Sequence, residues 1–181
     1  MDPTAHCVGD ETSAFMINYV RSQGLPVIST LSDAPRNLHG IILSDVLEHL
    51  PEPRSVLRDL RKLIVPSGLL CVNVPDFSEN RVRMIAKQLK HGQRPPRELN
   101  PWEHLNYFSP ETLRRMLNDE GFNTIDQQVD IGLRPNLRGV AKLGNAIKSI
   151  GRLLAYTATS RSNAMLIVAQ ARISGANVKT Y

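Results

Sequence analysis

The sequence Gly40-Ile41-Ile42-Leu43-Ser44-Asp45-Val46-Leu47-Glu48-His49 decides the fold class of this chain. Its apolar run, Ile41 to Leu43, is too short for a helix and rich in β-branched residues, so it predicts a strand buried on both faces. Ser44 and Asp45 follow this run directly. Ligands of open parallel sheets bind in the crevice at the carboxyl ends of the strands. The stretch therefore predicts a functional edge at Ser44 and Asp45.

A helix and a second strand are expected after this stretch. Pro53 suits a first helical position. The apolar side chains that follow recur at helical spacing and are Val56, Leu57, Leu60, Leu63 and Ile64. Pro66-Ser67-Gly68 is expected to end the helix, and residues 69–74 to form a second buried strand. A strand, a helix and a strand with short links predict a parallel sheet with a right-handed crossover.

The flanking segments predict further strands and helices. Upstream, strands at 5–9 and 25–29 are expected to enclose a helix that Thr12 or Ser13 caps and Gly24 stops. Downstream, the pattern predicts helices at 83–90 and from Ser109 to Gly121, then strands at 123–131 and 164–173. An amphipathic helix is expected at about 137–157, and it either covers the sheet or lies on a membrane or partner.

The length predicts one domain, and the order of strands and helices makes it α/β, at 1–173, with an irregular insert or lid at about 76–108 and a tail at 174–181. The chain has 181 residues, of which 41% are hydrophobic and 22% charged. It has no apolar run long enough to span a membrane and no signal-peptide pattern at its start. Cys7 and Cys71 are expected to be reduced thiols, so the sequence predicts a cytoplasmic protein.

The net charge of +5 raises the question of nucleic-acid binding. The basic residues are scattered over several segments and are not interleaved with aromatic residues, so no specific nucleic-acid partner is expected.

Two motifs resemble class I S-adenosylmethionine (SAM)-dependent methyltransferases, in the branch common among small-molecule, quinone and glycan methyltransferases. The first runs from Asp45 to Pro53 (Asp-Val-Leu-Glu-His-Leu-Pro-Glu-Pro) and continues, after a helix, with Val65-Pro66-Ser67-Gly68 and a strand ending Val72-Asn73-Val74-Pro75. The second runs from Trp102 to Leu113 (Trp-Glu-His-Leu-Asn-Tyr-Phe-Ser-Pro-Glu-Thr-Leu) and is closed by Glu120-Gly121-Phe122. The resemblance covers roughly residues 7–171.

The resemblance implies a Rossmann-like, doubly wound sheet that is mostly parallel, with an antiparallel final strand at 164–173. It implies SAM as the cofactor. Glu11, or Asp10 as the alternative, corresponds to the carboxylate that holds the ribose hydroxyls, and Asp33 falls near the residue that meets the adenine amino group. The residues that correspond to the pocket around the methionine half and the methyl group are Ser44, Asp45 and Val46.

The chain departs from this family at its start. It has no Gly-x-Gly-x-Gly turn, and it begins about where the second strand of the family should, so the first strand and helix are absent. The resemblance therefore leads us to expect a sheet without its central strand and a cofactor site without one wall. Either the segment is supplied elsewhere, or cofactor binding is weakened or lost.

His104 and His49 are the candidate catalytic residues. His104 lies in the segment that the family uses as a lid, and His49 is adjacent to the carboxylate of Glu48. Each also has a structural alternative, in which its ring bonds a nearby backbone group. Trp102, Tyr107 and Phe108 either line an acceptor pocket or form a small satellite core.

No metal site is expected, because the five histidines show no paired spacing of the His-Glu-x-x-His kind. The predicted function is SAM-dependent transfer of a methyl group to an oxygen, nitrogen or carbon of a small-molecule or glycan-like acceptor. Two alternatives stay open. One is an inactive methyltransferase-like scaffold, and the other is a basic protein that binds membrane or nucleic-acid surfaces.

Overall fold

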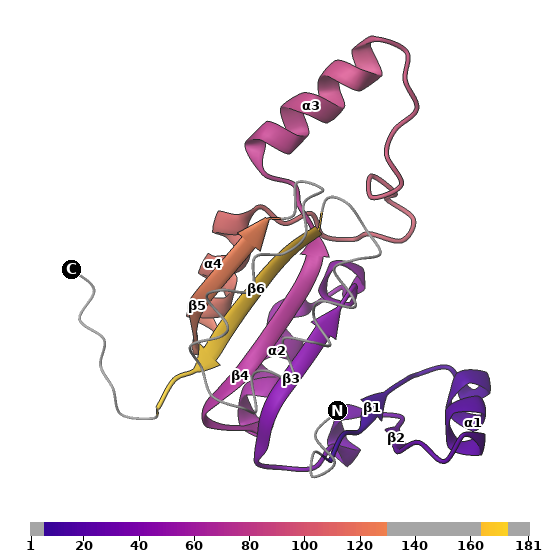
Figure 1. Ribbon diagram of the computed structural model, residues 1–181, viewed down its shortest axis with the longest axis vertical. Coiled ribbons are helices and arrows are strands. Elements are labelled where there is room, and N and C mark those ends of the chain that lie inside the picture. The colour runs from indigo at the N-terminus through magenta and orange to yellow at the C-terminus, as the bar shows by residue number, and fades with distance from the viewer. Residues whose placement is uncertain (1–5, 130–163, 174–181) are drawn as a thin grey trace.

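A four-stranded sheet carries the fold in the computed structural model, which describes residues 6–129 and 164–173 (Figure 1). Its strand order is β3-β4-β6-β5. β3 (Leu38–Ser44) and β4 (Ile64–Pro75) are parallel, and β6 (Ala164–Ala171) is antiparallel to β4 and to β5 (Phe122–Val129). Three strands therefore run in one direction and the last strand in the other, which confirms the predicted sheet.

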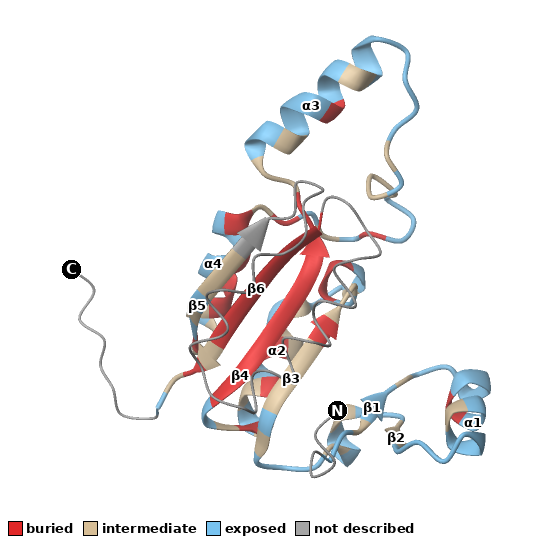
Figure 2. Cartoon of the chain, in the orientation of Figure 1, coloured by how far each residue is buried: buried red, intermediate tan, exposed pale blue. Residues whose placement is uncertain are grey.

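Helices α2 (Pro53–Leu63) and α4 (Pro110–Asp119) pack on one face of this sheet. Leu57 and Leu60 of α2, and Leu113 and Leu117 of α4, are buried against apolar side chains of β4 and β6. Figure 2 shows β4 and β6 buried along most of their length. The hydrophobic core therefore lies between the central strands and these two helices.

A second, smaller apolar cluster lies on the opposite face of the sheet. Its buried members are Leu69, Cys71, Leu166 and Val168. Cys71 is a free thiol, as is the exposed Cys7, and burial raises the pKa of Cys71 to about 12.

The strand predicted to be buried on both faces is only half-buried. Ile41 and Ile42 of β3 are of intermediate exposure, whereas β4 holds the fully buried residues. Among the described strands, β3 pairs with β4 alone, so its other edge lacks a neighbouring strand there. An edge strand loses less solvent contact than a central one, which explains the difference.

The predicted end of the first crossover helix is also wrong. α2 ends at Leu63, before Pro66, and β4 begins at once with Ile64. Leu38 pairs with Ile64, and Gly40 pairs with Leu69, so residues 65–68 bulge out of the register. The turn residues therefore interrupt the strand pairing and do not end the helix.

The N-terminal residues form a separate unit. β1 (Gly9–Asp10), α1 (Ala14–Ser22) and β2 (Val27–Ile28) follow in sequence, and β1 pairs with β2 in a two-stranded parallel sheet. Ser13 caps α1 by accepting a hydrogen bond from the backbone N–H of Met16, as the sequence predicts. Figure 1 shows this unit beside the start of β3, away from the carboxyl end of that strand.

The insert after β4 begins with α3 (Glu79–Lys90), which projects beyond the carboxyl ends of β3 and β4 (Figure 1). The chain returns to the sheet at Phe108, whose carbonyl oxygen accepts a hydrogen bond from the N–H of Phe77 at 2.9 Å. Ser109 then caps α4 in a capping box with Thr112. The predicted helix at about 137–157 and the tail at 174–181 lie outside the described residues.

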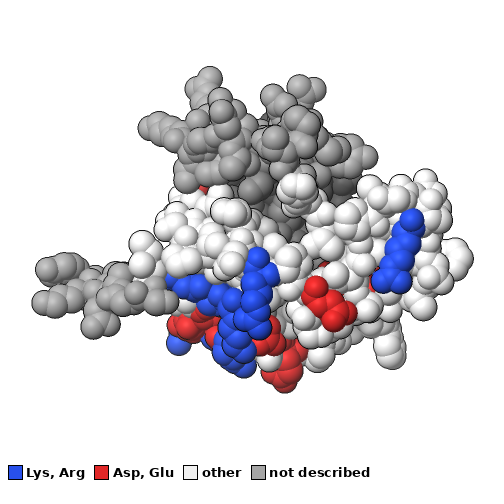
Figure 3. All heavy atoms as spheres, turned by 90° about the horizontal axis from the view of Figure 1, so that it is seen from below, with Lys and Arg blue, Asp and Glu red and all other residues white. Residues whose placement is uncertain are grey.

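Basic and acidic side chains alternate on the surface near α2 and the end of α4. Arg54 contacts Asp119 at 3.0 Å and Glu120 at 3.1 Å, and Arg58 contacts Glu120 at 3.3 Å. Figure 3 shows Lys and Arg side chains beside Asp and Glu side chains on the face seen from below. In the described part of the chain, no helix is long and apolar enough to cross a membrane.

Leu117 tests the packing of α4 on the sheet. Its side chain is fully buried, so Leu117→Ala should lower the free energy of unfolding by about 2–5 kcal/mol through lost apolar burial and the cavity left behind. Urea denaturation measures this change. The control Val82→Ala, at a position 48% exposed on α3, should change stability by less than about 0.5 kcal/mol. Equal effects of the two substitutions would contradict the described core.

Candidate functional site

The carboxyl end of β3 is a tight polar turn. Ser44 pairs with Asn73 of β4, and the N–H of Asp45 donates to the carbonyl oxygen of Asn73 at 2.9 Å. Asp45 has a φ of 52°, in the left-handed region that aspartate tolerates better than most residues. The chain then passes through Val46, which is 37% exposed, into the 3₁₀ turn η2 (Leu47–His49). This turn places the first sequence motif at the edge of the sheet.

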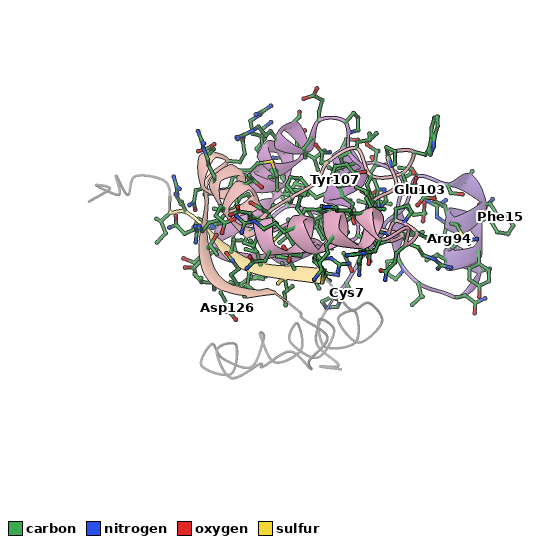
Figure 4. The ribbon with its side chains drawn as sticks, turned by 90° about the horizontal axis from the view of Figure 1, so that it is seen from above. Cys7, Phe15, Arg94, Glu103, Tyr107 and Asp126 are labelled. Carbon is green, nitrogen blue, oxygen red and sulfur yellow. The ribbon has the colours of Figure 1, made fainter. Side chains whose placement is uncertain are left out.

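The second sequence motif lies directly against the first. The backbone N–H groups of Leu105 and Asn106 both donate to the carbonyl oxygen of Glu48, at 2.8 and 3.0 Å. The side-chain amide of Asn106 donates to the carbonyl oxygen of Leu50 at 2.6 Å. Figure 4 shows Glu103 and Tyr107 on this connection, seen from above the carboxyl ends of the strands. Two motifs that are far apart in sequence therefore form one site.

The two candidate catalytic histidines meet in this site. The ring centroids of His49 and His104 are 4.8 Å apart, in an edge-to-face arrangement. Nδ1 of His49 lies 2.7 Å from the carbonyl oxygen of Glu103, and Nδ1 of His104 lies 2.8 Å from that of Glu98. Because a carbonyl oxygen only accepts hydrogen bonds, each Nδ1 carries the hydrogen. Each neutral ring therefore keeps a lone pair on Nε2.

Glu48 is the functional candidate that sequence reasoning missed. Its side chain is 1% exposed, and neither carboxylate oxygen has a hydrogen-bond partner. Oε1 of Glu48 lies 3.9 Å from Nε2 of His49, its neighbour in the 3₁₀ turn η2. Burial raises the pKa of Glu48, and the nearby His49 and His104 oppose this rise. The sequence signal for Glu48 was its position next to His49, between Leu47 and Leu50.

The acidic residues expected to hold the nucleoside lie elsewhere. Asp10 ends β1, and Glu11 follows it and accepts a hydrogen bond from the N–H of Ser13 at 2.8 Å. Burial, and secondarily the charge of Glu11, raises the pKa of Asp10. Asp33 ends the short turn η1 (Leu31–Asp33) that precedes β3. The structure thus brings together one part of the predicted set, namely Ser44, Asp45, Val46, His49 and His104, but it does not bring Asp10, Glu11 or Asp33 to them.

The aromatic residues of the second motif have different environments. Phe108 is buried in the main core, and Tyr107 packs edge to face on Phe77 with centroids 4.7 Å apart. Trp102 is 92% exposed. Phe108 therefore belongs to the core, whereas Trp102 packs on no part of it.

Comparisons with known proteins agree with this architecture. A family model described as a methyltransferase domain matches residues 17–127. A search of curated protein sequences finds no significant match.

Solved structures similar to this chain include a SAM-dependent methyltransferase from Thermotoga maritima, described as a possible histamine N-methyltransferase. It is 15% identical, with a TM-score of 0.56 over 92% of this chain and 72% of that chain. A SAM-dependent methyltransferase from Archaeoglobus fulgidus is 19% identical, with a TM-score of 0.54 over 90% and 75% of the two chains. Magnesium protoporphyrin IX methyltransferase from Synechocystis, with bound S-adenosylhomocysteine, is 13% identical, with a TM-score of 0.54 over 92% and 64%. At these identities the likeness shows the fold.

The buried carboxylate of Glu48 should make stability depend on pH. The pKa of Glu48 in the folded chain is raised above its ordinary value of 4.5. Between the pKa of the unfolded chain and that of the folded chain, the folded chain therefore keeps a proton that the unfolded chain has lost. The free energy of unfolding should fall as the pH rises between these two pKa values and stay reduced at higher pH. Glu48→Gln, which keeps the shape and removes the charge, should weaken this fall.

Urea denaturation over a pH series, in buffer that contains a chelator, measures the effect. Glu52→Gln, at an exposed neighbouring position, should retain the pH dependence of the wild type. A Glu48→Gln profile that matches the wild type would show that this carboxylate is not the source.

Proposed function

The chain belongs to the methyltransferase-domain family, and from this membership we propose that it transfers a methyl group to a small-molecule or glycan-like acceptor. SAM is the methyl donor of this family. The polar turn at the carboxyl end of β3, with Asp45 at its centre, is the observation that carries the proposal. It lies where open α/β sheets bind their ligands.

The described residues fit the cofactor in part. Ser44 offers a hydroxyl and Asp45 a carboxylate beside the apolar Val46, a set suited to the positively charged methionine half of SAM. Glu11 and Asp10 are the proposed partners of the ribose hydroxyls, and Asp33 that of the adenine amino group. Strand β1, which ends at Asp10, lies beside the start of β3 and away from this turn (Figure 1), and the sequence has no glycine-rich turn of the family type.

The mechanism rests mainly on alignment. When bound, SAM supplies an electrophilic methyl group on its sulfonium. Asp45 would offset the positive charge of the donor, and Val46, 37% exposed, would border the methyl pocket. His104 and His49 are proposed to contact the acceptor, because both lie beside the turn that carries Asp45. Holding donor and acceptor in line supplies most of the rate acceleration that such a reaction needs.

An inactive methyltransferase-like scaffold is the second candidate. The observation that favours it is the separation of Asp10 and Glu11 from the end of β3 that carries Ser44. A domain that held only the methionine half would bind SAM weakly. Under either function, the proposed location is the cytoplasm, since Cys7 and Cys71 are both free thiols.

Asp45→Asn tests the role of the β3 turn. Asparagine has nearly the same shape and tolerates the left-handed backbone, so the change removes mainly the charge. The affinity for SAM should fall about tenfold or more, because a hydrogen bond to a charged group contributes about 1.5–3 kcal/mol. Isothermal titration calorimetry measures the affinity. Asp59→Asn, on the exposed face of α2, is the matched control and should bind as the wild type does.

Two outcomes would count against the proposal. Equal affinities for SAM in wild type, Asp45→Asn and Asp59→Asn would remove Asp45 from the site. No binding of SAM to the wild-type chain would favour the scaffold. If SAM binds, release of S-adenosylhomocysteine in the presence of phenolic, quinol and glycan acceptors identifies the acceptor class.

A further inference from the structure

Three side chains of metal-ligand type converge beside the β3 turn. One ligand atom each from Glu48, His49 and His104 lies within 4.8 Å of the other two. Two of them come from the first sequence motif and one from the second, and the hydrogen bonds from Leu105 and Asn106 to Glu48 hold the two motifs together. The cluster is therefore a product of the tertiary structure and not of a local spacing.

Glu48 points to a ligand of positive charge. It is 1% exposed, and both of its oxygens lack a hydrogen-bond partner. A buried carboxylate in this state is costly unless a cation or a donor compensates it. Its oxygens are available to a cation that enters the cluster.

The histidines are oriented as metal ligands are. Nδ1 of each ring is engaged by a backbone carbonyl oxygen, that of Glu103 for His49 and that of Glu98 for His104. In protein metal sites, the ring nitrogen that does not bind the metal usually makes a hydrogen bond of this kind, which sets the tautomer and the ring orientation. Nε2 of each ring is thereby left with the lone pair that binds a metal.

We propose that Glu48, His49 and His104 bind one divalent transition-metal ion of the zinc type. Two imidazoles and one carboxylate suit Zn²⁺ better than Mg²⁺ or Ca²⁺, which prefer oxygen ligands. The ligand atoms of a tetrahedral zinc ion lie about 3.4 Å apart, so small side-chain rotations would close the cluster around it. His49 is exposed and gives the ion a path from solvent.

Three protein ligands leave one coordination position open. In zinc sites this position takes an oxygen of water or substrate, and the ion lowers the pKa of that group. The open position would therefore take an oxygen of the acceptor or a water molecule. The site was not expected from the sequence. His104 lies 55 positions after His49, so the two histidines form no short metal-binding motif.

Zinc titration of the full chain tests the site without SAM or an acceptor, so its result is independent of the proposed methyl transfer. The chain carries Cys7→Ser, because the exposed thiol of Cys7 and the adjacent His6 are side chains of zinc-ligand type that would compete for the ion. After treatment with a chelator, calorimetry with ZnCl₂ should give one ion per chain. CoCl₂ should compete for the same site and give a visible absorption spectrum.

Matched variants locate the ion. Each ligand variant should lower the zinc affinity about tenfold or more, namely Glu48→Gln, His49→Gln and His104→Gln. Loss of a residue that only hydrogen-bonds a metal ligand already lowers metal affinity by about 10–100-fold. His91→Gln, at the exposed end of α3, is the control and should bind as the parent does. MgCl₂ should give no saturable binding at the same concentrations. Circular dichroism identifies any variant that fails to fold, and the exposed His49 is the position least sensitive to this.

The proposal is overturned by any of three results. These are no saturable binding of zinc to the parent chain, a zinc affinity in the folded ligand variants equal to that of His91→Gln, or a magnesium affinity equal to that for zinc. The first result would leave Glu48 and the two histidines as a structural ion-pair cluster.

Discussion

One backbone carbonyl oxygen, that of Glu48, holds the candidate site together. It accepts hydrogen bonds from the N–H groups of both Leu105 and Asn106, and the side chain of Asn106 adds a third bond to the carbonyl oxygen of Leu50. These contacts fix the long insert on the turn that follows β3. Together with the bond from Nδ1 of His49 to the carbonyl oxygen of Glu103, they place His104 beside His49.

The same arrangement leaves a buried carboxyl group without a hydrogen-bond partner. Glu48 lies in the 3₁₀ turn with neither carboxylate oxygen in a hydrogen bond, while the histidines beside it use Nδ1 to bond backbone carbonyl oxygens. Natural proteins rarely bury an unpaired carboxylate, because the loss of hydration is not recovered. Where one occurs beside two oriented imidazoles, a role in binding explains it better than a role in stability.

The fold and the site are separable in this chain. The core of β4, β6, α2 and α4 depends on apolar burial, which stabilises the fold. The family membership rests on the match over residues 17–127. The N-terminal unit lies outside that core, at the start of β3, and it carries Asp10 and Glu11. A family fold therefore does not by itself place every residue of the family's cofactor site, since function depends on the geometry of the site.

The sequence by itself determined the elements whose signals are local. The apolar spacing of α2, the Ser109 cap of α4 and the final strand β6 were all predictable, because periodicity and capping act over a few residues. The antiparallel direction of β6 was implied by the family resemblance and not by its local pattern. The end of α2 was misplaced, because Ile64 pairs with Leu38 before the turn residues are reached. Only the tertiary structure decided that Glu48 faces His49, that His104 joins them and that Glu11 does not lie near Asp45. These relations depend on pairings between distant segments, which no local pattern encodes.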